Sequence, residues 1–133
     1  MLDTHTLVWA VQNDPRLGKQ ARQLIQQEGQ DNLIPAISLW EIAMLAERRR
    51  ISLGCDTQGW IDDSLALSGI RLVPLEPEIA VDSNRLPDWS HKDPSDHLIV
   101  ATARFWRAPL LTADRAILDY GATGHVAVID ASR

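Results

Sequence analysis

Residues 93–114 read DPSDHLIVATARFWRAPLLTAD, and this stretch predicts a helix followed directly by a short strand. The helix is expected over 94–106, with Asp93 as its N-terminal cap and Asp96 beside the positive end of the helix dipole. The strand at 109–111 ends close to another acid, Asp114. Carboxylates at a helix start and a strand end are candidates for one cation-binding site.

Short apolar strands alternate with helices along the rest of the chain as well. We expect a strand stub at Met1-Leu2, strands over 32–37, 70–75 and 126–129, and helices after Asp3, over 19–30, from Ser38, around 60–67, and over 76–86 and 114–118. This alternation is typical of a three-layer α/β/α sandwich with a central parallel sheet. No linker or repeat interrupts it, so a single domain over 1–133 is expected.

Several acids fall where such a sheet would place a ligand, at the carboxyl ends of its strands. Asp3, Asp114 and Asp130 each follow an apolar strand closely, and Glu41 and Asp96 are each expected in the first turn of a helix. All five side chains could therefore face the same rim of the sheet.

Each acid also has a purely structural interpretation. Ser38 and Glu41 have the spacing of a capping box, Asp93 caps the helix after it, and Asp114, two residues after Thr112, could cap another. Taken singly, capping is the favoured role. Taken together, converging carboxylates would repel one another and raise each other's pKa, which a fold has no reason to tolerate without bound cations. Oxygen ligands suit Mg²⁺ or Mn²⁺, and a pair of such ions can activate water for phosphodiester cleavage.

Composition narrows the class of protein. The chain has 133 residues, 45% hydrophobic and 23% charged, with no apolar run long enough to span a membrane and no signal-peptide pattern. A single cysteine excludes an internal disulfide framework and a cysteine-rich zinc site. A cytoplasmic protein is therefore expected. The net charge of −5 argues against holding nucleic acid by bulk electrostatics, unless divalent ions offset clustered acids.

Other polar features carry less information. The four histidines show no metal-ligand spacing, although His5 is two residues from Asp3 and His97 is next to Asp96. Arg48-Arg49-Arg50 is interpreted as a solvated helix end, favoured by the dipole at a helix C-terminus. Most of the five tryptophans are expected in the core or facing a partner.

Four segments together resemble the successive motifs of the PIN domain, and in particular those of VapC-type toxins. They are LDTH at 2–5, SLWEI at 38–42, DPSDHLIVATA at 93–103 and LTAD at 111–114. The resemblance covers essentially the whole chain, with the motifs in the family's order. One departure is that only Met1 and Leu2 precede the first aspartate, where the family usually has several apolar residues.

The resemblance implies an RNA endonuclease, the toxin of a toxin–antitoxin pair, that uses Mg²⁺ or Mn²⁺. It also implies a homodimer and a small antitoxin protein that blocks the acidic pocket. By position, the family's acidic quartet corresponds to Asp3, Glu41, Asp96 and Asp114, its small hydroxyl residue to Thr112, and an additional acid to Asp93.

Two other functions remain open from the residues. A metal-dependent phosphatase is one, because Leu2-Asp3-Thr4-His5 faintly resembles an aspartyl-nucleophile motif, although His5 stands where a second acid is expected. A binding module that keeps the acidic pocket without catalysis is the other, and the complete quartet argues against it.

Overall fold

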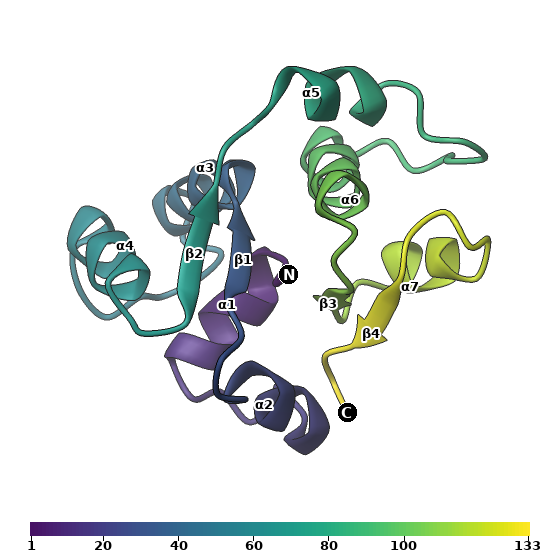
Figure 1. The fold of residues 1–133 in the computed structure, drawn as a ribbon. Coiled ribbons are helices and arrows are strands. Elements are labelled where there is room, and N and C mark those ends of the chain that lie inside the picture. The colour runs from purple at the N-terminus through teal and green to yellow at the C-terminus, as the bar shows by residue number, and fades with distance from the viewer.

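The computed structural model describes the whole chain, residues 1–133. In chain order its elements are α1 (Thr4–Val11), α2 (Lys19–Ile25), β1 (Asn32–Pro35), α3 (Ala36–Glu47), α4 (Thr57–Leu65), β2 (Ile70–Val73), α5 (Pro77–Ser83), α6 (Pro94–Trp106), β3 (Leu110–Thr112), α7 (Arg115–Gly121) and β4 (Val128–Asp130). The strands lie in the middle of the molecule with the helices around them (Figure 1).

The N-terminal residues join two strand pairs into one parallel arrangement. β1 pairs in parallel with β2, and β3 pairs in parallel with β4. Leu2 forms a parallel bridge with Leu111 of β3, and its N–H donates to the carbonyl oxygen of Leu33 in β1 at 3.0 Å. The spatial order is therefore β2, β1, Leu2, β3, β4. The predicted strand stub at Met1-Leu2 is confirmed as this central position.

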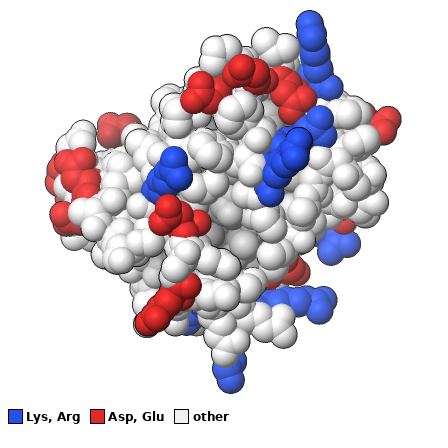
Figure 2. Space-filling model, viewed as in Figure 1, with Lys and Arg blue, Asp and Glu red and all other residues white.

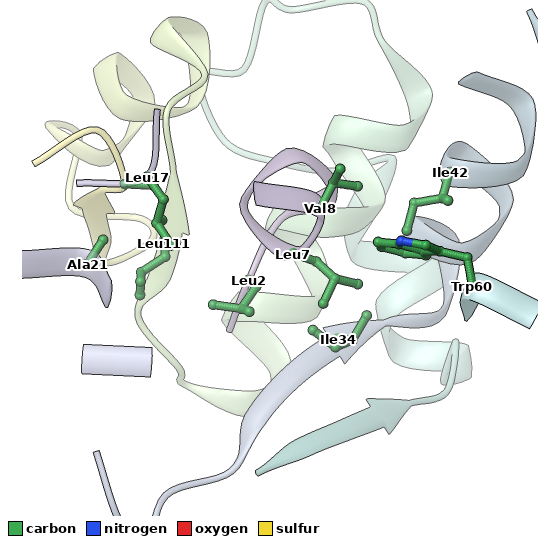
Figure 3. Packing of buried hydrophobic residues seen from close by; sticks show 10 residues of the cluster. Leu2, Leu7, Val8, Leu17, Ala21, Ile34, Ile42, Trp60 and Leu111 are labelled. Atoms are coloured by element: carbon green, nitrogen blue, oxygen red, sulfur yellow. The ribbon is translucent and has the colours of Figure 1, made fainter. Parts of the chain in front are cut away.

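Alternate residues along these strands point to opposite faces and into two separate cores. Leu2, Ile34 and Leu111 belong to one buried cluster, which packs against α1, α2, α3 and α4 (Figure 3). Their neighbours Met1 and Leu110 belong to the other, which packs against α6 and α7. Helices thus cover both faces of the strands, which confirms the predicted three-layer α/β/α sandwich.

The start of α3 differs from the prediction. A strand through Ile37 and a helix from Ser38 were expected, but β1 ends at Pro35 and the helix begins at once. Ser38 is fully buried and its hydroxyl oxygen accepts the hydroxyl proton of Thr4 at 3.1 Å, so it caps no helix end and forms no capping box. Glu41 consequently lies in the second turn of α3 instead of the first.

The helix predicted over 94–106 is confirmed as α6. The Asp93 side chain caps it by accepting the backbone N–H of Ser95 at 3.0 Å, and Pro94 occupies the first turn, where its missing N–H costs nothing. Arg107 ends it in the left-handed conformation at a φ of 49°. Asp96 therefore lies in the first turn, as expected.

The remaining predicted elements are present with shifted ends. The helix expected over 19–30 ends at Ile25, where its apolar spacing stops. The strand expected over 126–129 is β4, Val128–Asp130, because it pairs only along the three residues of β3. None of the helices has the length and apolar character that a membrane span requires.

Candidate metal centre

Asp3 lies between the Leu2 position of the sheet and α1, and its side chain is buried. One carboxylate oxygen accepts the backbone N–H of Thr6 at 2.9 Å, and the other accepts the hydroxyl proton of Thr112. Burial raises the pKa of Asp3, while the hydrogen bonds from Thr112 and Thr6 act in the opposite direction. The Thr112 oxygen also accepts the backbone N–H of Asp114 at 3.0 Å. Thr112 therefore connects two acids from distant parts of the chain.

Ser95, in the first turn of α6, makes the same kind of connection between Glu41 and Asp93. Its hydroxyl oxygen lies 2.9 Å from a carboxylate oxygen of Glu41 and 2.8 Å from one of Asp93. A hydroxyl has one proton to donate, so it cannot fully satisfy both carboxylates. Because Glu41 is only 9% exposed, water can supply few of the hydrogen bonds that its carboxylate lacks. The remaining carboxylate oxygens are available to a cation.

Asp96 experiences the negative charge of the other acids most strongly. Burial, and then the charges of Asp93 and Asp114, raise the pKa of Asp96 from 3.8 to about 7. The charge of Glu41 adds to this effect, and a hydrogen bond with His91 opposes it. The His91 Nε2 atom lies 2.8 Å from Asp96 Oδ2. Asp96 is therefore where the carboxylates from α3, α6 and the start of α7 act on one another.

No lysine or arginine is ion-paired or hydrogen-bonded to Asp3, Glu41, Asp93, Asp96 or Asp114. One ligand atom each from His91, Asp93 and Asp96 lie within 4.8 Å of one another. The donors are carboxylate oxygens with one imidazole nitrogen, and hard divalent cations such as Mg²⁺ and Mn²⁺ prefer such oxygen-rich sites. The donor set therefore fits a divalent cation.

The fifth acid expected at the rim lies apart from this cluster. Asp130 ends β4, and its carboxylate accepts the backbone N–H of Ser132 at 2.9 Å and the Ser132 hydroxyl at 2.6 Å. These hydrogen bonds lower the pKa of Asp130, the reverse of the effect at Asp96. Asp130 is satisfied by its own turn and has no part in the carboxylate cluster.

Two residues beside the acids, Ser95 and His91, had no role in the sequence prediction. His91 lacks metal-ligand spacing, and only its place in the loop that enters α6, five residues before Asp96, could have indicated the contact. Neither of the two histidines singled out by sequence bonds a carboxylate of the site, although the charge of His5 is near enough to lower the pKa of Asp3. His5 is exposed, and the His97 ring bonds the backbone oxygens of Ser83 at 3.1 Å and His91 at 2.5 Å. His97 thus fixes the loop that carries His91.

Charged side chains on the face seen in Figure 2 are mixed, without a continuous basic surface. Acidic side chains gather over α4 and α5, and basic ones are scattered over the rest of the face beside further acids. The overall charge is −5. A polyanion would therefore meet net repulsion from the protein unless cations intervened.

Comparison with known proteins adds a family and a set of similar folds. The family model described as the PIN domain matches residues 1–122. The chain is 34% identical over 119 residues to Ribonuclease VapC22 of Mycobacterium tuberculosis, covering 88% of each chain.

Two solved structures share the fold at low sequence identity. A toxin–antitoxin complex from Klebsiella pneumoniae matches with a TM-score of 0.63 and 21% identity, covering 97% of this chain and 94% of that one. VapBC2 from Rickettsia felis, bound to a DNA fragment from its promoter, matches with a TM-score of 0.69 and 16% identity, covering 97% of this chain and 96% of that one.

Proposed function

Because this chain belongs to the PIN-domain family, we propose that it is a metal-dependent RNA endonuclease and the toxin of a toxin–antitoxin pair. The observation that carries the proposal is the set of contacts through which Thr112 links Asp3 to Asp114 and Ser95 links Glu41 to Asp93, with no lysine or arginine bonded to these acids. The similarity to a named ribonuclease over 88% of the chain selects RNA as the substrate class.

We further propose that Asp3, Glu41, Asp96 and Asp114 hold Mg²⁺ or Mn²⁺, with Asp93 as an accessory acid. When bound, such an ion lowers the pKa of a coordinated water and offsets the charge that develops on the phosphate. Within the chain, Thr112 and Ser95 fix the carboxylates through their hydroxyls. The unpaired carboxylates alone would repel a phosphodiester, so RNA approaches productively only when cations are present.

Cleavage of a mixed RNA pool with Mg²⁺, with Mn²⁺ and with EDTA tests this function. We expect cleavage with the metals and none with EDTA. Asp96→Asn should lower the rate roughly 100-fold or more, because it removes a charged oxygen ligand. Asp130→Asn is the matched control, since Asp130 ends a neighbouring strand outside the carboxylate cluster, and it should cleave like the wild type. Intact RNA with both metals would sink the proposal.

The same purified protein distinguishes the proposed nuclease from a phosphatase and from a non-catalytic binding module. A phosphatase would release phosphate from a small phosphomonoester without cutting RNA. His5, where such an enzyme would need a second acid, is exposed and forms no hydrogen bond to the carboxylate cluster. A non-catalytic binding module would do neither. We expect RNA cleavage and no phosphomonoester turnover.

The proposed antitoxin partner needs an accessible surface beside the acids. Trp40 is 59% exposed and directly precedes Glu41 on α3, so a protein that covers the acidic cluster would also meet this indole. Trp40→Ala should weaken binding of the proposed antitoxin, measured by calorimetry, and leave RNA cleavage unchanged. Equal affinity of Trp40→Ala and wild type would remove this surface from the proposed interface.

A homodimer, the other expected partner, would also need an apolar surface. Val81 on α5 and Phe105 on α6 are 49% and 43% exposed, and these two helices pack against each other. We propose that this surface joins two copies. Light scattering should give the mass of a dimer for the wild type and of a monomer for Phe105→Glu, and a monomeric wild type would contradict the proposal.

A further inference from the structure

A pocket of about 440 Å³ adjoins the carboxylate cluster, between the loop 88–91 and α7. His91 lines one wall, and its Nε2 atom is the one that contacts Asp96 at 2.8 Å. Ala116, two residues after Asp114, lines the opposite wall. A group bound in this pocket would therefore lie next to a phosphate held at the acids. In Figure 1 the loop that joins α5 to α6 lies on the same side of the molecule as α7.

The pocket walls are held in place by contacts behind them. The Tyr120 hydroxyl donates to the carbonyl oxygen of Pro87 at 2.7 Å, which ties α7 to the loop. The rings of Trp89 and Tyr120 meet edge to face with centroids 4.6 Å apart, and Trp89 meets His91 in the same way at 5.7 Å. The ring of His97, on α6, hydrogen-bonds the carbonyl oxygen of His91. A ligand would therefore enter a preformed site.

The lining suits a neutral ring with N–H donors better than a phosphate. It contains no lysine or arginine, and its charged side chains are the carboxylates of Asp88 and Asp119. Both have partners at the rim, because Asp119 Oδ1 pairs with Arg115 at 3.0 Å and Asp88 Oδ2 pairs with His125 at 3.3 Å. Each pairing engages one carboxylate oxygen and leaves the other to accept a hydrogen bond. Trp89 and Tyr120 supply the aromatic surface.

We propose that this pocket binds the nucleobase that adjoins the scissile phosphate and selects it through Asp119. The proposal rests on the RNA endonuclease function proposed above. Proteins that read single-stranded RNA take unstacked bases into aromatic sites and bond their Watson–Crick edges. Guanine presents adjacent N1–H and N2–H donors on that edge, which a carboxylate accepts well. The pocket should therefore favour guanine over the other bases.

Sequencing of the fragments from a mixed RNA pool tests the assignment in the full protein. The wild type should show a guanine preference at one position beside the cut. In Asp119→Asn that preference should fall roughly 10-fold, mainly through KM, while cleavage of sites without guanine stays unchanged. Arg115→Ala is the matched control. It breaks the same ion pair but keeps the carboxylate, so the guanine preference should survive.

A binding measurement separates failure of the pocket from failure of the nuclease. Guanosine has no phosphate, so in EDTA it probes the pocket without the metal site. It should shift the indole N–H resonance of Trp89 in a ¹⁵N spectrum, more than adenosine does and less in Asp119→Asn. If the wild type cleaves RNA with the same base profile as Asp119→Asn, the pocket assignment is overturned. If the wild type cleaves no RNA, the nuclease fails, and the guanosine titration alone decides the pocket.

Discussion

Burial and neighbouring negative charge act together on Asp96. Its pKa in the folded protein is about 7, compared with an ordinary value of 3.8. The native state therefore holds a proton at Asp96 that the unfolded chain releases between these two pH values. Binding a divalent cation displaces that proton, so the cation should bind more tightly as the pH rises through about 7.

The sign of the effect on stability follows from the same proton. A carboxyl with a raised folded-state pKa favours the native state at low pH, and the advantage disappears as the pH rises from about 4 to about 7. In EDTA, the free energy of unfolding should fall by a few kcal/mol across this window. Asp96→Asn should flatten the slope. Denaturant titrations at pH 5 and pH 8 measure the change in unfolding free energy. An equal change in wild type and Asp96→Asn would show that the raised pKa does not belong to Asp96.

Asp93 combines two opposing contributions at one residue. Its side chain caps α6 through the Ser95 N–H, while its charge raises the pKa of Asp96. Asn caps helices about as well as Asp, so Asp93→Asn removes the charge alone, whereas Asp93→Ala also removes a cap worth about 1 kcal/mol. In EDTA at pH 8, thermal unfolding should rank Asp93→Asn above wild type and Asp93→Ala below Asp93→Asn. If Asp93→Asn is less stable than wild type, repulsion among the acids is too weak to matter.

At the scale of elements, the sequence predicted those whose local chemistry and burial agree. α6 was predicted at both ends because Asp93 and Pro94 mark its start and an apolar face runs through it. The predicted start of α3 was too late. Serine is a common helix-capping residue, but the Ser38 hydroxyl bonds Thr4 on another helix instead. Spacing along the chain cannot reveal a contact between residues 34 positions apart.

In the carboxylate cluster, too, the sequence indicates residues placed by local structure and misses those placed by contacts between distant segments. The positions of Asp3, Asp96 and Asp114 at strand ends and helix starts could be predicted, whereas Glu41 lies one turn further into its helix than expected. Ser95 could not be predicted, since it bonds Glu41 54 positions away, and His91 could not, since its place depends on how the loop before α6 folds against Tyr120 and His97. Asp130 does end β4 in register with Thr112, but its carboxylate bonds Ser132 instead of the other acids, a contact that its position after a strand does not indicate.

At the scale of the whole molecule, the two strand pairs are held together through Leu2. This side chain is fully buried and lies between β1 and β3, directly before Asp3. Leu2→Ala should cost about 2–5 kcal/mol of unfolding free energy, because it leaves a cavity at the centre of the sheet. Leu67→Ala, at a side chain that is 49% exposed, should change stability by less than about 0.5 kcal/mol. Urea titrations of both variants measure this, and equal losses would contradict the central position of Leu2.

We propose that acids from residues 3, 41, 93, 96 and 114 form one cation site at an edge of the sheet, supported by the Thr112 and Ser95 hydrogen bonds and by the raised pKa of Asp96. Diffraction from crystals soaked in Mn²⁺, at a wavelength with manganese anomalous scattering, tests this claim most directly. We predict an anomalous peak within bonding distance of an Asp96 carboxylate oxygen and of at least one other acid of the cluster. The peak should be absent from Asp96→Asn crystals and present in Asp130→Asn crystals. A wild-type crystal whose only manganese lies away from Asp96, or which binds none, would rule out Asp96 as a metal ligand.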